Sequence, residues 1–313
     1  MKNTIKNLIK KWDWLGCKLK ILNIKYDKFI SKYYSDEEYI IKQYKKRTNE
    51  KLNFNELHTF NEKIQWLKLY YKNDMMHKCV DKYEVREFIK EKGCENLLIK
   101  NYGVWDKFED INFDKLPQKF ILKLTNGSSF NYICLNKTKK EIRKMKRRFK
   151  MWLKVNYYQY AKEWAYKDVK NRVICEELLE PSSGNPPEDY RFFCFKGKVH
   201  CFSIDYDSVI NGIKNSNYKR NIYDRNGKKL EAQIKYPNKE NIDFEKNSGI
   251  TQMISYAEKI SSNFPHARID FYYFDNKIYF GEITFYHASG YQKIKPHEFE
   301  VQLGDLIDID SLK

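Results

Sequence analysis

The sequence has little of what marks disulfide-rich, zinc-binding or membrane-spanning proteins. Its seven cysteines are scattered, with no C-x-x-C pair and no nearby cluster of histidines, which argues against a disulfide framework or a zinc site. No apolar run approaches the length that spans a bilayer, and the N-terminal segment has no uninterrupted apolar core of a secretory signal. We therefore expect a cytoplasmic protein whose cysteines pack as small apolar side chains.

The sequence also lacks the residue pattern of nucleophilic catalysis. Its six histidines are dispersed, and no Ser/His/Asp or Cys/His constellation is evident. No internal repeat, low-complexity segment or recognised nucleic-acid-binding module stands out.

Positive charge and aromatic side chains are abundant. The formal net charge is +17, the sequence pI is about 9.3, and the chain holds 25 tyrosines and 20 phenylalanines. With 42% hydrophobic and 32% charged residues it is globular, and 313 residues suffice for one large domain or two to three small ones. The charge attracts anions, but it does not distinguish among nucleotides, nucleic acid, acidic glycans and an anionic membrane.

Residues 1–52 form a basic extension. Lysines alternate there with isoleucine, leucine and tryptophan, which predicts an amphipathic helix broken near Gly16. Such a helix can lie on an anionic membrane, with its lysines toward the headgroups. The alternative, which we favour, is a helix packed on the body of the protein.

Beyond the extension, helical and strand-like patterns follow one another along the chain. We expect a helical region over 53–118, a first lobe over 119–180 and a second lobe over 181–313, with a proline-containing loop at 183–187 between the lobes. Helices are expected within 54–74, over 81–89 with a C-cap at Lys92-Gly93, over 137–154 and over 251–264, and strands within 97–104, 119–131, 172–180 and 189–207.

The segment Ala267 to Gly290 reads as two aromatic and β-branched strands joined by a turn at its Asp-Asn-Lys. With a three-residue turn, Asp270 lies opposite Glu282 and Arg268 opposite Thr284. Two facing carboxylates repel unless a cation lies between them, and a divalent metal with oxygen ligands is the economical candidate. A surface salt bridge that joins Arg268 to both carboxylates is the alternative.

Two further patterns suggest anion or metal binding. Residues 119–131 form a strand that runs into a small-residue loop, where backbone N–H groups and Lys123 could meet phosphate oxygens; an ordinary hairpin is the alternative. Asp205-Tyr206-Asp207 is a D-x-D, a pattern by which some metal-dependent glycosyltransferases hold a sugar nucleotide. D-x-D is also common by chance.

Taken in order, several segments resemble the TupA-like ATP-grasp proteins, a family found among genes for bacterial surface polysaccharides. The resemblance runs from about Phe54 to the C-terminus, and it implies an α+β ATP-grasp fold in which two lobes clasp ATP. The segments that carry it are FNEKIQWLKL, DKYEVREFI, LPQKFILKLTNGSSFN, ICEELLE, DYRFFCFKGKV, ARIDFYYFDNKIYFGEITFYHASGY and LGDL.

The resemblance implies an ATP site on the first lobe and the helical region before it. It consists of two lysines that contact ATP, a phosphate loop with Gly-Ser-Ser where the family usually has Gly-Ser-Gly, and a hinge that reads adenine. In the hinge a carboxylate or the Glu177 carbonyl accepts from the amino group, and the Leu179 N–H donates to the ring. These residues are Lys82, Lys123, Asn126, Gly127, Ser128, Ser129, Glu176, Glu177 and Leu179.

On the second lobe the resemblance implies the catalytic half of the site. Arginines would clamp the transferred phosphate or the acyl substrate, and oxygen donors would hold Mg²⁺, with a threonine where the superfamily usually has asparagine. A histidine near the acceptor end could line the site or simply pack. The arginines are Arg191, in a D-x-R with Asp189, Arg220 and Arg268; the metal ligands are Asp270, Glu282 and Thr284; the histidine is His287.

The function implied by the resemblance is ATP- and Mg²⁺-dependent carboxylate-amine ligation through an acylphosphate. The substrates would be an acidic glycan precursor, such as a uronic acid, and an amine or amino acid. A lipid-linked acceptor would suit a cytoplasmic protein in peripheral contact with the inner face of an anionic membrane through residues 1–50. The alternatives are a metal-dependent glycosyltransferase, supported by the D-x-D alone, and a nucleic-acid binder driven by charge, for which no specific recognition is expected.

Overall fold

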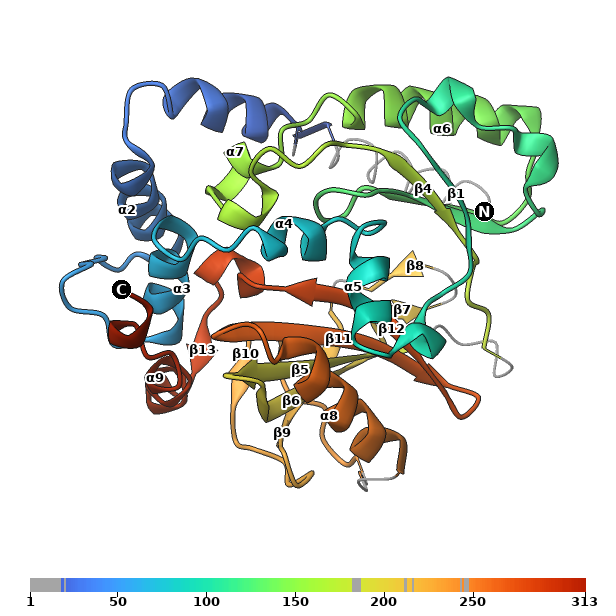
Figure 1. Ribbon diagram of the computed structural model, residues 1–313. Coiled ribbons are helices and arrows are strands. Elements are labelled where there is room, and N and C mark those ends of the chain that lie inside the picture. The colour runs from blue at the N-terminus through green and yellow to red at the C-terminus, as the bar shows by residue number, and fades with distance from the viewer. Residues whose placement is uncertain are drawn as a thin grey trace.

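The computed structural model describes residues 18–19, 21–181, 187–210, 213–215, 217–242, 244 and 248–313. In this part of the chain two antiparallel sheets lie on opposite sides of a central pocket, and helices cover them (Figure 1). The predicted α+β class with two lobes is confirmed. The predicted helix break near Gly16 lies outside the described residues. None of the described helices is both long enough and apolar enough to cross a bilayer.

The first sheet has four strands and is covered by a long basic helix. Strand β2 alternates buried and half-buried residues, so that Leu122 points into the core beneath the helix while Lys123 points to the other face. Helix α6 buries Met145, Phe149 and Trp152 in the same core and leaves its lysines outside. The strands, in spatial order, are β1 (Asn101–Trp105), β4 (Val173–Glu176), β2 (Phe120–Leu124) and β3 (Asn131–Cys134), and the helix is α6 (Lys139–Trp152).

The second sheet has five strands and two unlike faces. One face carries aromatic side chains such as Phe192 and Phe271, which pack in the core against helix α8. The other carries the charged residues that alternate with them, among them Arg191 and Asp270. The strands, in spatial order, are β12 (Lys277–Thr284), β11 (His266–Phe274), β5 (Glu188–Phe195), β6 (Lys198–Tyr206) and β9 (Lys219–Asp224), and the helix is α8 (Ser248–Ser261).

The remaining helices gather at one end of the molecule and over the pocket (Figure 1). Helices α2 and α3 both begin with a capping box, formed by Ser35 with Glu38 and by Thr59 with Glu62. Residues 21–30 are helical as well. The bounds are α2 (Asp36–Thr48), α3 (Phe60–Leu69), α4 (Met75–Val80), α5 (Val85–Glu91), α7 (Tyr158–Ala161) and α9 (His297–Asp305).

Short elements complete the described chain. The two-residue strands form two small ladders, β10 with β13 and β7 with β8. They are β7 (Val209–Ile210), β8 (Ile213–Lys214), β10 (Gln233–Ile234) and β13 (Ile294–Lys295), and the 3₁₀ helices are η1 (Glu95–Leu97), η2 (Phe108–Asp110), η3 (Phe113–Lys115), η4 (Trp164–Tyr166), η5 (His287–Gly290) and η6 (Asp310–Leu312).

The predicted helix at 81–89 begins later than expected. The Asp81 carboxylate accepts from the N–H groups of Tyr83 and Glu84 at 2.8 and 3.0 Å, which holds this stretch in a turn before α5 starts at Val85. Its predicted end is confirmed, because Lys92 is the C-cap and Gly93 has the positive φ of 59° that ends many helices.

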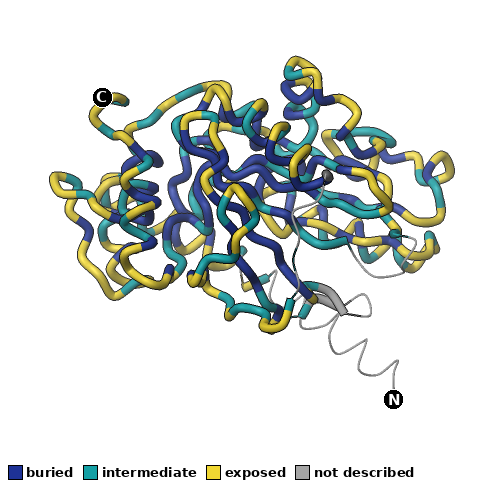
Figure 2. The backbone as a smooth tube through the Cα atoms, turned by 90° about the horizontal axis from the view of Figure 1, so that it is seen from below, coloured by how far each residue is buried: buried dark blue, intermediate teal, exposed yellow. Residues whose placement is uncertain are grey.

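Buried residues follow the strands of both sheets and the inner faces of the helices (Figure 2). The two sheets have separate apolar cores, one beneath α6 and one beneath α8. All six described cysteines are buried in these cores and free of disulfides, in agreement with the prediction that they pack as apolar side chains.

Candidate active site

Strands β11 and β12 form the predicted hairpin, but its turn is shorter than predicted. Asp275 and Asn276 alone connect the strands, and both have positive φ angles, 48° and 55°, as a type I′ turn requires. Aspartate and asparagine tolerate this left-handed conformation better than most residues. The three-residue turn is therefore wrong, since Lys277 already pairs with Phe274.

A β-bulge compensates for the shorter turn. Phe271 pairs with Phe280 and Asp270 with Glu282, which leaves Gly281 as an extra residue on β12. A Cβ at Gly281 would lie 2.9 Å from the Asp270 carbonyl oxygen, so a side chain there would collide with the neighbouring strand. Because the bulge shifts β12 by one residue, the predicted pairing of the two carboxylates is confirmed.

Arg268 supplies a cation between the two facing carboxylates. Its Nε and Nη2 donate to the two oxygens of Asp270 at 2.7 and 2.6 Å. Nη2 also donates to Glu282 Oε1 at 3.3 Å and to Thr284 Oγ1 at 3.0 Å, and Thr284 is its cross-strand partner as predicted. The salt bridge considered as an alternative is thus formed, but Arg268 and Asp270 are buried and do not lie on the surface.

His287 fixes the other end of the Arg268 side chain. Its Nδ1 accepts from Arg268 Nη1 at 2.6 Å, so its Nε2 carries the proton that is donated to Gln292 Oε1 at 3.0 Å. Burial, and then the charge of Arg268, lower the pKa of His287 well below its usual value. His287 is therefore a buried, neutral residue that orients Arg268.

Two further arginines are tied together on the strands beyond β11. Arg191 on β5 is the cross-strand partner of Asp270, and its Nη2 lies 2.9 Å from Asp205 Oδ2. Arg220 on β9 is only 1% exposed, and its Nε and Nη2 donate to the two oxygens of Asp205 at 2.5 and 2.9 Å. Asp205 thus joins both arginines, and Arg220 lies two strands farther from β11 than Arg191 does.

The same arrangement defines the surroundings of Asp205-Tyr206-Asp207, the D-x-D of the sequence. Asp205 is buried between two guanidinium groups, whereas Asp207 lies beyond the end of β6 and is paired with Lys239 Nζ at 2.9 Å. Each carboxylate is therefore paired with a protein cation.

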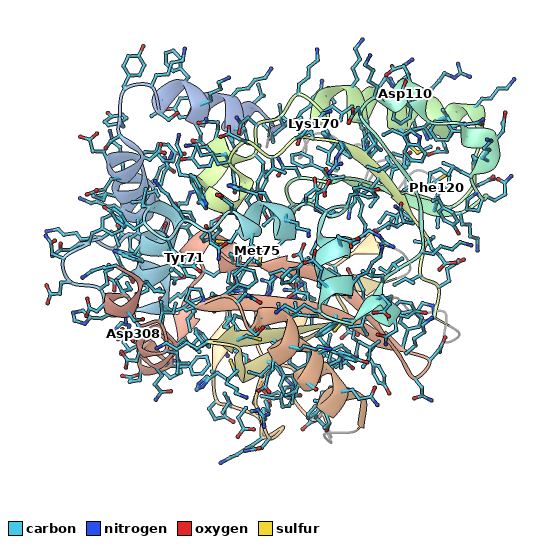
Figure 3. All side chains as sticks on the ribbon, viewed as in Figure 1. Tyr71, Met75, Asp110, Phe120, Lys170 and Asp308 are labelled. Atoms are coloured by element: carbon cyan, nitrogen blue, oxygen red, sulfur yellow. The ribbon has the colours of Figure 1, made fainter. Side chains whose placement is uncertain are left out.

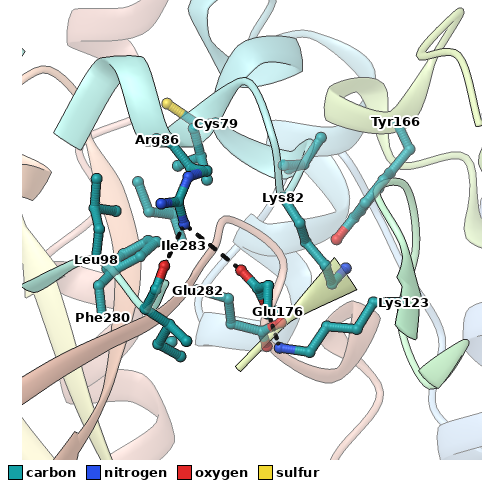
Figure 4. A pocket seen from close by; sticks show the side chains of 14 residues that line it. Cys79, Lys82, Arg86, Leu98, Lys123, Tyr166, Glu176, Phe280, Glu282 and Ile283 are labelled. Carbon is teal, nitrogen blue, oxygen red and sulfur yellow. Dashed lines mark hydrogen bonds and ion pairs between the residues drawn. The ribbon is translucent and has the colours of Figure 1, made fainter. Parts of the chain in front are cut away.

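The opposite wall of the pocket carries the predicted lysines. Lys123 on β2 donates from Nζ to Glu176 Oε2 at 2.7 Å, and Glu176 Oε1 lies 3.7 Å from Arg86 Nη1 (Figure 4). Lys82 donates from its backbone N–H to Thr125 O at 2.9 Å and from Nζ to Gly127 O at 2.7 Å. Burial lowers the pKa of Lys82.

The pocket between the two walls is open to solvent, and 14 residues from both lobes line it. The predicted residues that reach it are Lys82, Lys123, Glu176 and Glu282, to which the structure adds Arg86 and Tyr166 (Figure 4). The sequence could have indicated Arg86, because it belongs to the segment DKYEVREFI that also contains Lys82. No sequence pattern indicated Tyr166. The apolar part of the lining is formed by Cys79, Val80, Val85, Leu98, Ile99, Phe280 and Ile283, and Gly281 completes it.

The predicted phosphate loop at 126–129 connects β2 with β3. Gly127 has a φ of 87°, and a Cβ there would lie 2.8 Å from the Tyr157 ring. Ser129, which stands at the place of the family's second glycine, has a φ of 68°, a conformation that costs a serine about 1 kcal/mol. Asn126 is buried and donates from Nδ2 to Val169 O at 2.9 Å. The loop is thus anchored at its start and strained at its end.

The predicted hinge begins where β4 ends. The Glu176 side chain reaches the pocket, whereas Glu177 and Leu179 are not among the residues that line it. The Glu177 N–H donates to Lys100 O at 2.9 Å, which ties the hinge backbone to the residue just before β1. The structure therefore brings one of the three predicted hinge residues to the pocket.

The two facing carboxylates have unlike pKa values. Burial raises the pKa of Asp270 to about 6, although Arg268 opposes the rise. Burial would also raise the pKa of Glu282, but the charges of Arg268, Lys82 and Arg191 together hold it below its usual value. Both groups are ionised at neutral pH, Glu282 more firmly than Asp270.

The donors near Arg268 suit magnesium. Among the described residues no three histidine, cysteine, aspartate or glutamate side chains gather as metal ligands. Asp270, Glu282 and Thr284 offer oxygens only, and the space between them is already occupied by a positive charge. Because Mg²⁺ prefers oxygen and commonly takes one or two protein carboxylates together with substrate phosphates, this set fits an ion that arrives with a nucleotide.

Two lobes of antiparallel sheet, with Lys82 and Lys123 on one wall of the pocket between them and Glu282 on the other, are the arrangement of an ATP-grasp fold. A sequence model of the family described as TupA-like ATPgrasp matches residues 62–308. The chain belongs to this family, and so to the ATP-grasp enzymes. No curated protein matches the chain in sequence.

Several solved ATP-grasp structures are similar in fold at low sequence identity. D-alanine–D-alanine ligase from Bacillus anthracis shares 17% identity at a TM-score of 0.45, covering 76% of this chain and 69% of its own. The ADP complex of purK, N5-carboxyaminoimidazole ribonucleotide synthetase, shares 13% identity at a TM-score of 0.42, covering 72% of this chain; this chain spans 50% of its length. The ligase PsnB with a variant precursor, Mg and ADP shares 12% identity at a TM-score of 0.40, covering 75% of this chain and 59% of its own.

Proposed function

We propose that this chain is an ATP-dependent carboxylate-amine ligase that works through an acylphosphate. The observation that carries the proposal is the pocket with unlike walls. Lys82 and Lys123 lie on one side, and the carboxylate of Glu282, held by Arg268, lies on the other. The lysines suit the phosphates of ATP, and the apolar lining suits a flat base.

Nucleotide binding would replace contacts within the protein. Lys123 now donates to Glu176, and Lys82 to the carbonyl of Gly127. Phosphate oxygens would take over both donors: Lys82 would exchange a neutral carbonyl for a stronger charge-assisted bond, and Lys123 would exchange one anionic partner for another. Glu176 would keep Arg86 as its partner, at 3.7 Å.

The proposed reaction has two transfers. A carboxylate oxygen of the acceptor attacks the γ-phosphorus of ATP, the bond to the β-phosphate oxygen breaks, and ADP leaves. The nitrogen of an amine then attacks the carbonyl carbon of the acylphosphate, the phosphate departs, and the ammonium proton is lost to water or phosphate. Arg191 and Arg268 line the charged face of the second sheet, where they would stabilise the transferring phosphoryl group and the acyl oxygen.

Asp270 and Glu282, with Thr284, would hold Mg²⁺. When bound, the ion would neutralise charge on the β- and γ-phosphates. Arg268 occupies the same oxygens now, so its guanidinium has to release at least part of its bond to Asp270 when a nucleotide enters. The freed N–H groups of Arg268 would then be available to the acyl or phosphoryl oxygens.

The proposed acceptor is an acidic precursor of a bacterial surface polysaccharide, such as a uronic acid, and the second substrate an amine or amino acid. Support comes from the net charge of +17 and from the arginines on the acceptor side of the second sheet. We further propose that the enzyme works at the cytoplasmic face of the membrane, where a lipid-linked precursor would be presented.

Release of ADP tests the proposed activity. Wild-type protein with Mg²⁺ and ATP is incubated with a panel of uronic acids and amines, singly and in pairs, and ADP is measured. We expect ADP release to need both partners and to be lost in Arg191→Met. ADP release that needs neither partner, or transfer from a sugar nucleotide without ATP, would contradict the ligase proposal.

A further inference from the structure

An exposed apolar stripe runs along the first described helix. Leu19, Leu22, Tyr26 and Phe29 recur at intervals of three and four residues, so they share one side of a helix, and Tyr33 continues the spacing in the turn that follows residue 30. Their exposed fractions lie between 53% and 69%, which is unusual for side chains of this size. The opposite side of the same helix is the one that packs on the protein.

The inward side of this helix is fastened at several points. Ile24 is buried in the core beneath α6, and Asp27 is buried as well. Ser31 donates to Gln159 Oε1 at 3.2 Å, and just beyond the helix Asp36 pairs with Lys162 Nζ at 3.0 Å. The helix therefore packs on the body of the protein with one face, and its apolar stripe is turned outward on the other.

The charges that flank the stripe are of one sign. Lys25, Lys28 and Lys32 are exposed beside it, while the helix's aspartate, Asp27, is turned inward and buried. A second copy of the helix on this stripe would bring lysines against lysines, which disfavours self-association. Lysines beside leucine, phenylalanine and tyrosine match the headgroup and acyl boundary of an anionic bilayer, since tyrosine places a ring in the apolar layer and a hydroxyl in water.

Helix α6 extends the same surface. Its buried residues join the core that also contains Ile24, and the two helices lie along the same upper edge of the molecule (Figure 1). Long side chains project outward from both of them along that edge (Figure 3). The exposed cations of α6 and of residues 153–154, which follow it, are Lys139, Lys140, Arg143, Lys146, Arg147, Lys150 and Lys154.

We propose that the apolar stripe at residues 19–33 and the cationic face of α6 together form a docking surface for an anionic membrane. The stripe inserts at the headgroup boundary, and α6 lies over the charged headgroups. This surface deepens the proposed function, since it would bring the pocket to a lipid-linked acceptor, but it stands on observations that are independent of the nucleotide site.

Vesicle sedimentation tests the docking surface. The full chain is mixed with vesicles of phosphatidylcholine alone or with added phosphatidylglycerol. We expect binding to the anionic vesicles only, weakened about tenfold or more by Leu22→Glu with Phe29→Glu, and weakened with a smaller salt dependence by Arg143→Gln, Arg147→Gln and Lys150→Gln. Met75→Glu, at an exposed apolar residue on α4, is the matched control and should bind as wild type does.

Two further measurements keep the outcomes separate. Circular dichroism and the stabilisation by Mg²⁺ and ATP should be unchanged in the stripe variant, so lost docking is distinguished from lost folding or lost nucleotide binding. Equal binding to neutral vesicles, unaltered binding of the stripe variant, or a dimer in sedimentation that the stripe substitutions abolish would overturn the proposal.

Discussion

The two walls of the pocket hold their charges in different ways. On the wall of the first sheet each lysine has one principal side-chain contact: Lys82 Nζ donates to a loop carbonyl and Lys123 to a carboxylate. On the wall of the second sheet the charges are shared, since Arg268 bonds to Asp270, Glu282, Thr284 and His287. The first wall can exchange a partner for a ligand, whereas the second keeps its geometry before a ligand arrives.

This difference suggests that the two walls have different roles. A cation with a single partner loses little when a phosphate replaces that partner, so the first wall suits binding and release. A buried network of shared ion pairs is expensive to break, because each group left without a partner keeps its desolvation cost. Such a network preorganises arginines for charge that develops during reaction.

The largest expected effect comes from breaking the shared wall. Asp205→Ala would leave Arg191 and Arg220 without their common carboxylate, and we expect a loss of about 3–5 kcal/mol in the free energy of unfolding. Asp207→Ala, at the exposed end of the same motif, should change it by about 0.5 kcal/mol at most. Urea unfolding measures the free energy of unfolding of both variants. Equal losses would contradict a larger contribution from the buried network.

A smaller effect is expected from the bulge that aligns the carboxylates. Gly281→Ala should cost about 1–3 kcal/mol, because its Cβ would collide with the Asp270 backbone, and it should weaken Mg²⁺-dependent ATP binding. Gly93→Ala is the control: its φ of 59° strains a side chain, but its Cβ would meet only the flexible end of Lys259. Calorimetric titration with ATP should separate them, and normal ATP affinity in the Gly281 variant would contradict the role of the bulge.

On the exchangeable wall, Lys123→Met should weaken ATP binding. Loss of a charge-assisted bond to phosphate is worth about 1.5–3 kcal/mol, or roughly tenfold to a hundredfold in the dissociation constant. Lys119→Met, an exposed lysine just before the same strand, serves as the control. If both variants bind ATP as wild type does, Lys123 is not a nucleotide contact.

The last expected effect depends on pH and concerns Lys68, which fastens η5 next to the shared wall. Its Nζ donates to Ser289 O at 2.6 Å and to Gln65 Oε1 at 2.8 Å, and burial lowers its pKa to about 7. Between this pKa and the ordinary value of a lysine, the unfolded chain binds more protons than the folded one, so stability should rise with pH over that window by up to about 1 kcal/mol per pH unit.

The measurement for Lys68 is a comparison of pH profiles. Urea unfolding of wild type and Lys68→Met is followed between pH 7 and pH 10, and the difference between them isolates this lysine from other titrating groups. Wild type should gain on the variant as the pH rises. Parallel profiles would mean that Lys68 stays charged in the folded protein, held by Glu163.

How far sequence could predict this molecule depends on the range of the contacts. Alternation along the strands placed Arg268 and Asp270 on one face, and the family resemblance located the lysines of the other wall. The pairing of Asp270 with Glu282 was correct although the predicted turn was one residue too long, because the bulge at Gly281 offsets the error. A bulge depends on the partner strand, so a glycine in a single strand does not reveal it.

Contacts between residues that are far apart in the chain could not be predicted from the sequence. Asp205 and Arg220 are partners across β6 and β9, and nothing in the motif around Asp205 indicates that its carboxylate forms an ion pair with an arginine. Lys68 and Ser289 are separated by 221 residues. The facing carboxylates correctly indicated a cation, but whether Arg268 or a metal supplies it depends on the reach of the side chain, which a pattern does not contain.

The most direct test of the account is thermal stabilisation by ligands. Wild type and the double variant Asp270→Asn with Glu282→Gln are heated with Mg²⁺ and ATP, with ATP alone, and with Mg²⁺ and UDP-sugars. A ligand at a hundredfold excess over its dissociation constant should add about 2.7 kcal/mol to the apparent stability. We predict this gain for wild type with Mg²⁺ and ATP only, and its loss in the double variant; stabilisation by a UDP-sugar without any by ATP would contradict the account.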